Sequence, residues 1–466
     1  EISEVNNTIR RNFTIYNDDL VPVYPYEFSI VSHQGVTLKA STLNPFAGEK
    51  KYLLQMDTTE KFNSPLLLST QITSNGGVLK WQPNITLKDS MVYYWRSAMD
   101  TSAENPFHRW TVSSFVYIPQ SLPGWNQSHF YQLQKDKYSD IYLDSNSRKF
   151  NFVGVDKKLQ VQNVCMNGPS PATYTWPDYL VKMNGSTIYN HGCDPFPVYA
   201  SLQFIIIDTL TGQPWYNELN TTTNKGRFGS FFPCRIGEGC VSSTGVNCKD
   251  PFFEFSFLTT AARQTIINFL DSIPAGYYVC MQPRLSIGPV GNVQKNTVFV
   301  NNWKADTSSM GSNNSLYHKL RDFGFTAIDS LYKNRPMAFW IRKGDLSTVK
   351  QYVESDSSKK LYAEFDFQTH LFEGSIVTEK IGPATMWSSF KRVGKSLDSN
   401  PGDSVTVAIY GINSSGAETL LANVVGDTSL TFIDANQYPY VKLAMLNKDN
   451  QFQTPEQLKS WRILYQ

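Results

Sequence analysis

Met91-Val92-Tyr93-Tyr94-Trp95-Arg96 decides the fold class, because it is a short apolar run of the β-branched and aromatic residues that strands favour. Similar runs recur over residues 1–118 and alternate with turn signals such as Asn75-Gly76-Gly77. They are Phe28–Val31, Tyr52–Met56, Val78–Trp81 and Trp110–Tyr117. This spacing predicts an immunoglobulin- or fibronectin-like β-sandwich over residues 1–118. Trp95 is expected to pack in its core rather than to bind a ligand.

A second series of short strands predicts another β-sandwich over residues 351–466. The expected strands are Tyr362–Phe367, Ser375–Glu379, Ser404–Tyr410, Thr431–Asp434 and Tyr440–Leu446. Asn400-Pro401-Gly402-Asp403 predicts a turn, since Pro fixes φ and Gly permits positive φ. Glu364 and Asp366 alternate with phenylalanines, which indicates the solvated face of a strand rather than the carboxylate pair of a glycoside hydrolase.

Residues 119–350 combine a β segment with alternating buried runs and helical patterns, which predicts an α/β module between the sandwiches. Ser201–Asp208 is almost continuously apolar, as in a strand buried on both faces. A helix capped by Thr259 or Thr260 is predicted to end at Pro274-Ala275-Gly276. A second helix is expected over Ser315–Phe323, with strands at Tyr277–Met281 and Met337–Ile341. The expected architecture is therefore mainly β and multi-domain.

The totals exclude several classes of protein. The 466 residues exceed what one hydrophobic core organises, so three or four domains are expected. The net charge is only +2 and the basic residues are dispersed, which argues against nucleic acid as a partner. No run of about 18 apolar residues exists, so no membrane-spanning helix is expected. The chain begins at Glu1 without an initiator Met or signal peptide, which suggests a mature product or an excised fragment.

The six cysteines all lie in the middle of the chain. Their even number predicts up to three disulfides in one exported module, formed among Cys165, Cys193, Cys234, Cys240, Cys248 and Cys280. The spacing of Cys234, Cys240 and Cys248 is wider than that of a zinc knuckle, so no metal site is expected there.

The sequence offers no catalytic constellation that we can identify. His191-Gly192-Cys193 could bring an imidazole beside a thiol, but a disulfide is the favoured fate of Cys193. Zinc-protease, serine-hydrolase and phosphate-loop motifs are missing, so we expect no catalytic residue and no cofactor. Asp427, Asp434 and Asp449 lie near loops and are expected to cap turns, although they leave a calcium site open.

Several fragments of the middle module occur in a common order that resembles the interleukin-like EMT inducer domain. They are Val161–Cys165, Met183–Tyr189, Leu202–Asp208 with Thr211-Gly212, Phe269–Val279, Leu320–Gly324 and Arg335–Gly344. The resemblance implies a small disulfide-tied β/α fold. The segment carrying Cys234, Cys240 and Cys248 departs from that compact pattern, which leaves the pairing of the disulfides open.

The flanking regions resemble large surface proteins of Bacteroidetes. The matching stretches are Val21–Phe28, Lys39–Phe46, Asp57–Pro65, Ile381–Ala384 with Trp387, Ile433–Ala435 with Tyr438–Leu443, and Thr454–Leu458 with Trp461. They are similar to the region beyond the catalytic domain in gingipain-type, sortase-like peptidases of the type IX secretion and gliding system. The resemblance implies export to the cell surface, association with the outer membrane, and a longer parent protein.

These observations lead to three hypotheses about function. The first is a non-catalytic extracellular scaffold that docks on outer-membrane or other cell-surface proteins. The second is carbohydrate binding by the middle module, for which the best stacking platforms are Trp176, Trp215 and Trp303, although a role as a partly buried loop anchor is favoured for each. The third is an accessory part of a cysteine peptidase whose catalytic domain lies outside this chain.

Overall fold

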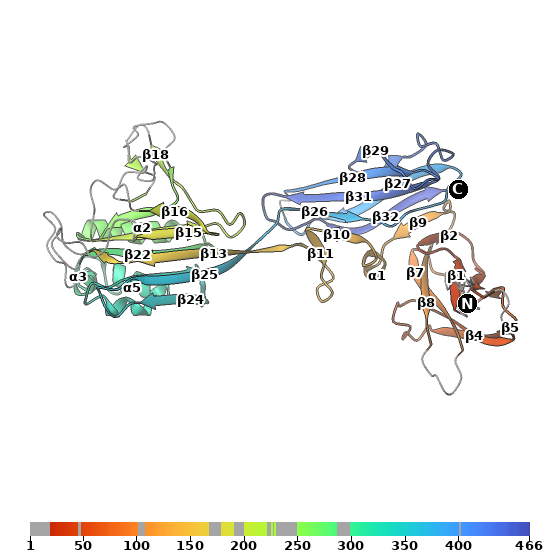
Figure 1. Cartoon of the computed structure of the whole chain (residues 1–466), viewed down its shortest axis with the longest axis horizontal. Coiled ribbons are helices and arrows are strands. Elements are labelled where there is room, and N and C mark those ends of the chain that lie inside the picture. The colour runs from red at the N-terminus through yellow and green to blue at the C-terminus, as the bar shows by residue number, and fades with distance from the viewer. Residues whose placement is uncertain are drawn as a thin grey trace, which may run out of the picture. The chain divides into compact units, whose positions relative to one another are not determined.

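The structure, a computed structural model, divides the chain into two compact units (Figure 1). The first joins residues 1–153 to residues 371–466, and the second is residues 154–370. These units do not follow the predicted borders at 118/119 and 350/351. The described residues are 19–44, 48–100, 108–166, 179–190, 200–220, 225–226, 228–229, 249–286, 299–399 and 402–466.

One nine-stranded sheet explains why the two ends of the chain form a single unit. Its order is β30-β27-β32-β9-β2-β8-β7-β4-β5. The strands are β30 (Thr428–Ser429), β27 (Trp387–Lys395), β32 (Gln457–Tyr465), β9 (Gly124–Gln127), β2 (Ser29–Val31), β8 (Thr111–Tyr117), β7 (Met91–Met99), β4 (Lys50–Asp57) and β5 (Leu68–Ser74). Because β9 pairs with both β2 and β32, the sheet continues past the predicted domain border at 118/119.

The N-terminal part of this sheet forms the predicted first sandwich. Its second sheet has the order β1-β3-β6, with β1 (Leu20–Tyr24), β3 (Leu38–Thr42) and β6 (Val78–Trp81). Trp95 is fully buried in the shared core beside Tyr52 and Phe115. The expectation that Trp95 is a packing residue is therefore confirmed.

The C-terminal part of the sheet packs against a five-stranded sheet of order β10-β26-β31-β28-β29. Its strands are β10 (Lys137–Ser139), β26 (Glu373–Val377), β31 (Tyr440–Asp449), β28 (Asp403–Ile412) and β29 (Glu418–Val424). The predicted strand Thr431–Asp434 is wrong. Leu430 and Ile433 are buried through a turn, in which the Ile433 amide donates to the Leu430 carbonyl over 3.0 Å.

Short elements complete the first unit. Helix α1 (Phe130–Leu133) follows β9, and β11 (Ile141–Leu143) pairs with β12 (Phe150–Phe152) in a small ribbon. Leu133, Ile141 and Phe150 are buried in the core of the C-terminal sandwich. The segment after the predicted 118/119 border is thus packed into the first unit.

The second unit contains two large sheets, one small sheet and a layer of helices. The four-stranded sheet has the order β16-β15-β13-β25, and the other has the order β21-β17-β22-β23-β24 with β14 beside β22. The first sheet consists of β16 (Ser186–Asn190), β15 (Leu180–Met183), β13 (Gly154–Asn163) and β25 (Leu361–His370). The second consists of β21 (Phe253–Ser256), β17 (Ser201–Ile207), β22 (Tyr278–Ser286), β23 (Met337–Arg342), β24 (Asp345–Val353) and β14 (Cys165–Met166). Short strands β18 (Asn217–Asn220), β19 (Lys225–Gly226) and β20 (Lys249–Asp250) form a separate small sheet.

Apolar side chains cover both faces of the second sheet, as predicted from the Ser201–Asp208 run. Ile205 and Trp340 pack toward the four-stranded sheet, whereas Phe204 and Ile206 pack toward the helices. The helical elements are α2 (Thr260–Ser272), α3 (Phe299–Ala305), α4 (Thr307–Met310), α5 (Leu316–Asp322) and a 3-10 turn, η3 (Thr326–Ser330). Thr259 caps α2, since its hydroxyl accepts the Ala262 amide over 3.2 Å.

The predicted disulfides are wrong for the two cysteines that the structure describes. Cys165 and Cys280 carry free, buried thiols. Cys165 packs in the core beside the helices, and Cys280 packs in the core between the two sheets. Burial raises the pKa of both thiols. Cys193, Cys234, Cys240 and Cys248, and with them the His191-Gly192-Cys193 motif, lie outside the described residues.

Candidate functional site

The tryptophans proposed as ligand platforms differ in how deeply the structure buries them. Trp303, on α3, is only 1% exposed and packs edge-on against Phe257, so the idea that it stacks on a ligand is wrong. Trp215 is half-buried, and its ring meets Tyr277 edge-on with centroids 5.3 Å apart. Burial, together with the nearby Asp208 carboxylate, raises the pKa of Tyr277. Trp176 lies outside the described residues.

A cavity of about 310 Å³ in the first unit brings together aromatic rings and polar side chains. We call it the aromatic pocket. Four separate segments line it: the loop after β4, Tyr94 on β7, the start of α1, and the turn between β11 and β12. The lining residues are Thr58, Thr59, Glu60, Lys61, Asn63, Tyr94, His129, Phe130, Tyr131 and Arg148.

A buried carboxylate fixes the first wall of the aromatic pocket. Asp57 is 1% exposed and accepts the backbone amides of Thr58 over 2.6 Å and Ser64 over 2.9 Å. The hydroxyls of Thr59 and Ser64 also donate to it. Burial alone would raise the pKa of Asp57, but these hydrogen bonds outweigh burial and lower that pKa. The loop over residues 58–64 is thereby held in one shape.

Buried amide side chains fix the second wall, which includes α1. Gln132 accepts the backbone amides of Ser128 and His129 over 2.9 and 3.2 Å. Gln127 donates to the Gln132 carbonyl over 3.1 Å and accepts the Trp461 indole N–H over 2.7 Å. Both glutamines are 1% exposed. These bonds attach α1 to the nine-stranded sheet, so His129, Phe130 and Tyr131 have defined positions in the wall.

The lining of the aromatic pocket pairs a buried tyrosine with an exposed histidine. The Tyr94 hydroxyl lies 3.3 Å from Nδ1 of His129. Burial, with a contribution from Glu60, raises the pKa of Tyr94, so its hydroxyl stays neutral. Partial burial of the ring and the charge of Arg148 lower the pKa of His129. Both groups are therefore uncharged hydrogen-bonding groups at neutral pH.

A cation and two rings form the rim. The Arg148 guanidinium lies over Phe130 and Tyr131, 5.4 and 5.8 Å from their ring centroids. Such cation–π contacts hold an arginine without consuming all of its five N–H donors. The arrangement offers ring surface, donors and acceptors to one ligand of modest size.

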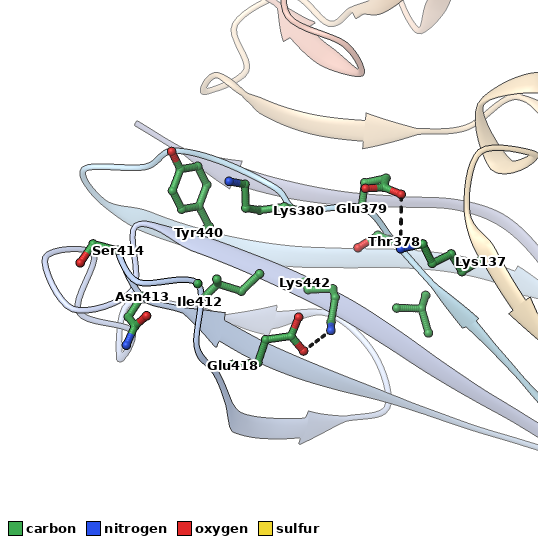
Figure 2. Close-up of a pocket in the computed structure, with 12 residues that line it drawn as sticks. Lys137, Thr378, Glu379, Lys380, Ile412, Asn413, Ser414, Glu418, Tyr440 and Lys442 are labelled. Atoms are coloured by element: carbon green, nitrogen blue, oxygen red, sulfur yellow. Dashed lines mark hydrogen bonds and ion pairs between the residues drawn. The ribbon is translucent and has the colours of Figure 1, made fainter. Parts of the chain in front are cut away.

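A second cavity, of about 460 Å³, lies at one end of the five-stranded sheet (Figure 2). Its wall carries Lys137, Lys380 and Lys442 together with Glu379 and Glu418. We call it the lysine pocket. The two pockets share no lining residue.

Sequence reasoning missed both pockets because each is assembled from distant segments. Tyr94, His129 and Arg148 are separated by tens of residues and form no local motif. The one available signal was the polar stretch Asp57–Pro65, which contributes the loop wall of the aromatic pocket.

Two of the three aspartates considered for calcium hold turns, and the third bonds to a neighbouring strand. Asp449 accepts the amides of Gln451 and Phe452, and Asp434 accepts the amide of Asn436. Asp427 accepts the amide of Arg392 over 3.0 Å. Among the described residues, no group of three or more His, Cys, Asp or Glu side chains is placed to hold a metal ion. In the same part of the chain, no helix is both long and apolar enough to cross a membrane.

No family model matches this chain, and no curated protein matches it. Among solved structures, an α-L-rhamnosidase from Dictyoglumus thermophilum aligns with 96% of this chain and 49% of its own, at 8% identity and a TM-score of 0.18. This chain thus spans about half the length of that protein. A carbohydrate-binding module of the β-sandwich superfamily aligns with 97% of this chain and 98% of its own, at 5% identity and a TM-score of 0.16. Scores this low leave the function to be argued from the residues of this chain.

Proposed function

We propose that this chain is a non-catalytic region of an exported cell-surface protein and that it binds a saccharide in the aromatic pocket. The observation that carries the proposal is the meeting of ring surface and fixed polar groups in one cavity of about 310 Å³. Sites for small ligands combine an apolar face with a few polar groups that set the orientation. A cavity of roughly 300 Å³ lies at the small end of ligand pockets, which suits one or two sugar units.

The chemistry of the lining supports binding rather than hydrolysis. Glycosidases that retain or invert configuration use two carboxyl groups on either side of the scissile bond. Glu60 is the one carboxylate among the described residues that line the aromatic pocket. The polar groups Asn63, Thr58 and Arg148 can instead hydrogen-bond sugar hydroxyls.

The surface location is supported by the resemblance of the flanking regions to surface proteins of the type IX secretion system. On this proposal, the chain is an accessory part of a longer protein, and the interleukin-like module lies between the two segments of the first unit in sequence. Its docking partners are outer-membrane or cell-surface proteins, and the saccharide site adds adhesion or targeting to that scaffold role.

The test is a glycan array probed with the whole chain and with the variant Phe130→Ala. Phe130 is half-buried at the pocket rim and belongs to none of the hydrophobic cores found in the described residues, so the substitution removes ring surface without opening a core. Phe432→Ala is the matched control, since Phe432 is 56% exposed in the same unit and lines neither pocket. We expect binding to one class of sugar that Phe130→Ala loses and Phe432→Ala retains.

Three other results would overturn the assignment. Equal binding by Phe130→Ala and the unmodified chain would place the site elsewhere, and loss of binding on Trp215→Ala would place it in the second unit. The absence of any binding by a chain shown to be folded by circular dichroism would leave the scaffold role without the saccharide site.

A further inference from the structure

The lysine pocket is built around a β-bulge. The register of β26 against β31 pairs Val377 with Ala444. Beyond the end of β26, an isolated bridge pairs Ile381 with Val441, which lies three residues before Ala444 in β31. The four steps from Val377 to Ile381 thus lie opposite only three steps on β31, so the segment after β26 contains one extra residue, which is a β-bulge. Thr378 and Ile381 are buried, and the two residues between them, Glu379 and Lys380, both reach the exposed face and line the pocket.

The bulge places like charges opposite each other. Ile381 and Val441 exchange two backbone hydrogen bonds of 2.8 and 3.0 Å, so the next positions in register are Lys380 and Lys442. Like charges directly across neighbouring strands are destabilising. Lys137 enters the same cavity from β10, which pairs with the far side of β26. Three lysines from three segments therefore line one cavity.

The carboxylates in the wall neutralise only part of this charge. Glu418 forms an ion pair with Lys442 (Figure 2). Glu379 lies 3.8 Å from Lys137, but both side chains are mostly exposed, so this pair is weak. Lys380 makes no ion pair within the described part of the chain, and its ammonium lies 4.0 Å from the ring centroid of Tyr440. The wall thus has a net charge of one positive unit, centred on a lysine held against a ring.

Polar groups on the hairpin between β28 and β29 complete the cavity. Asn413 accepts the amides of Ser415 and Ala417 over 3.0 and 2.9 Å, which fixes the hairpin. Ser414 also lines the cavity. A volume of about 460 Å³ is larger than a bare anion requires, and it fits an anion attached to a body of several heavy atoms.

We propose that the lysine pocket binds an acidic sugar unit, whose carboxylate or phosphate group is held by Lys380 and Lys442. The hydroxyls of the sugar would contact Ser414 and the edge of Tyr440. This site is separate from the aromatic pocket and does not depend on it, so the failure of one assignment leaves the other standing.

The experiment is saturation-transfer NMR on the whole chain at about 50 mM salt, where surface charges are weakly screened. The directly observed probes are glucuronate, glucose 6-phosphate and glucose; inorganic phosphate, which has no carbon-bound protons, is added as a competitor and its binding is measured by displacement. We expect at least one acidic sugar to bind and neutral glucose not to bind at this site. The comparison of the two acidic sugars decides between carboxylate and phosphate. Equal binding of inorganic phosphate and glucose 6-phosphate would overturn the sugar part of the proposal.

Two variants with opposite expected effects make the site assignment falsifiable. Lys380→Gln should lower the affinity for the acidic sugar roughly tenfold, the usual effect of losing one charge-assisted hydrogen bond. Glu418→Gln should raise the affinity for the acidic sugar several-fold, because the substitution releases Lys442 from its ion pair. Lys391→Gln, an exposed lysine on β27, is the matched control and should leave binding unchanged. Unchanged binding in both pocket variants, weaker binding in Glu418→Gln, or no binding of either acid by the folded chain would overturn the proposal.

Discussion

At the scale of single residues, the interior of the first unit contains a carboxyl group that sequence patterns could not reveal. Asp136 follows α1 and is 7% exposed. Its Oδ1 accepts the Gln127 amide over 3.0 Å, whereas Oδ2 has no hydrogen-bond partner in the part of the chain that the structure describes. Burial raises the pKa of Asp136 well above its ordinary value, although the Gln127 bond opposes that rise.

This carboxyl group predicts a pH dependence of stability. The folded protein keeps the proton of Asp136 at a pH where the unfolded chain has released it. Stability therefore falls as pH rises above about 3.9, the usual pKa of an unfolded Asp, and it continues to fall up to the raised folded pKa. Asp136→Asn keeps a hydrogen-bond acceptor for Gln127 and replaces the titratable carboxyl group by a neutral amide.

Asp136→Asn should therefore raise the melting temperature at pH 7 by a few degrees and leave it nearly unchanged at pH 3. Thermal unfolding followed by circular dichroism at both pH values measures the difference. A variant that melts lower than the parent at pH 7 would refute this prediction, because it would show that the ionised carboxylate stabilises the fold.

Also at the scale of single residues, the sequence around a tryptophan predicted its burial in one case and not in another. Trp95 lies in a strongly apolar strand, which indicated its place in a core. Trp303 lies in a polar sequence, and only the tertiary packing of its helix against Phe257 buries it. Local polarity was therefore a poor guide to its exposure.

At the scale of elements, patterns with strong local signals were read correctly. The apolar run of β17 and the capped helix α2 carry their information within a few neighbouring residues. Strand β9 does not, since its four residues follow Pro123 and show no pattern from which a strand was predicted. It becomes a buried strand only because β2 and β32 lie on either side of it, and β32 comes from the far end of the chain.

Helix α3 gives a prediction at this scale. Trp303 is the large buried side chain that attaches α3 to the helix-side core of the second unit. Trp303→Ala should lower the free energy of unfolding by about 3–5 kcal/mol, as is usual when a large buried aromatic side chain is truncated. Urea unfolding followed by circular dichroism measures it. A loss of sugar binding without a loss of stability would instead support the ligand role that the burial of Trp303 contradicts.

At the scale of the whole molecule, the chain leaves the first unit at residue 153 and returns at residue 371. Sequence patterns indicated three consecutive domains, because no local signal shows that β13 and β25 pair. These strands run antiparallel side by side over ten residues each, from Gly154 opposite His370 to Asn163 opposite Leu361 (Figure 1).

This organisation predicts which fragment folds by itself. A polypeptide of residues 154–370 should fold cooperatively, since it keeps both sheets and the helices of the second unit. A polypeptide of residues 119–350 should not, because it lacks β25 and exposes the edge of β13. Thermal unfolding and amide dispersion in NMR spectra compare the two. Cooperative folding of residues 119–350 alone would contradict the two-unit division.

The central claim is that the aromatic pocket binds a saccharide and does not cleave it. Calorimetric titration of the sugar selected on the array into the whole chain tests it most directly, with the titrated sugar then recovered and analysed by mass spectrometry. We predict one site per chain, binding at least roughly tenfold weaker in Phe130→Ala than in Phe432→Ala, and recovery of intact sugar. Equal affinity in the two variants, or recovery of hydrolysed sugar, would contradict the claim.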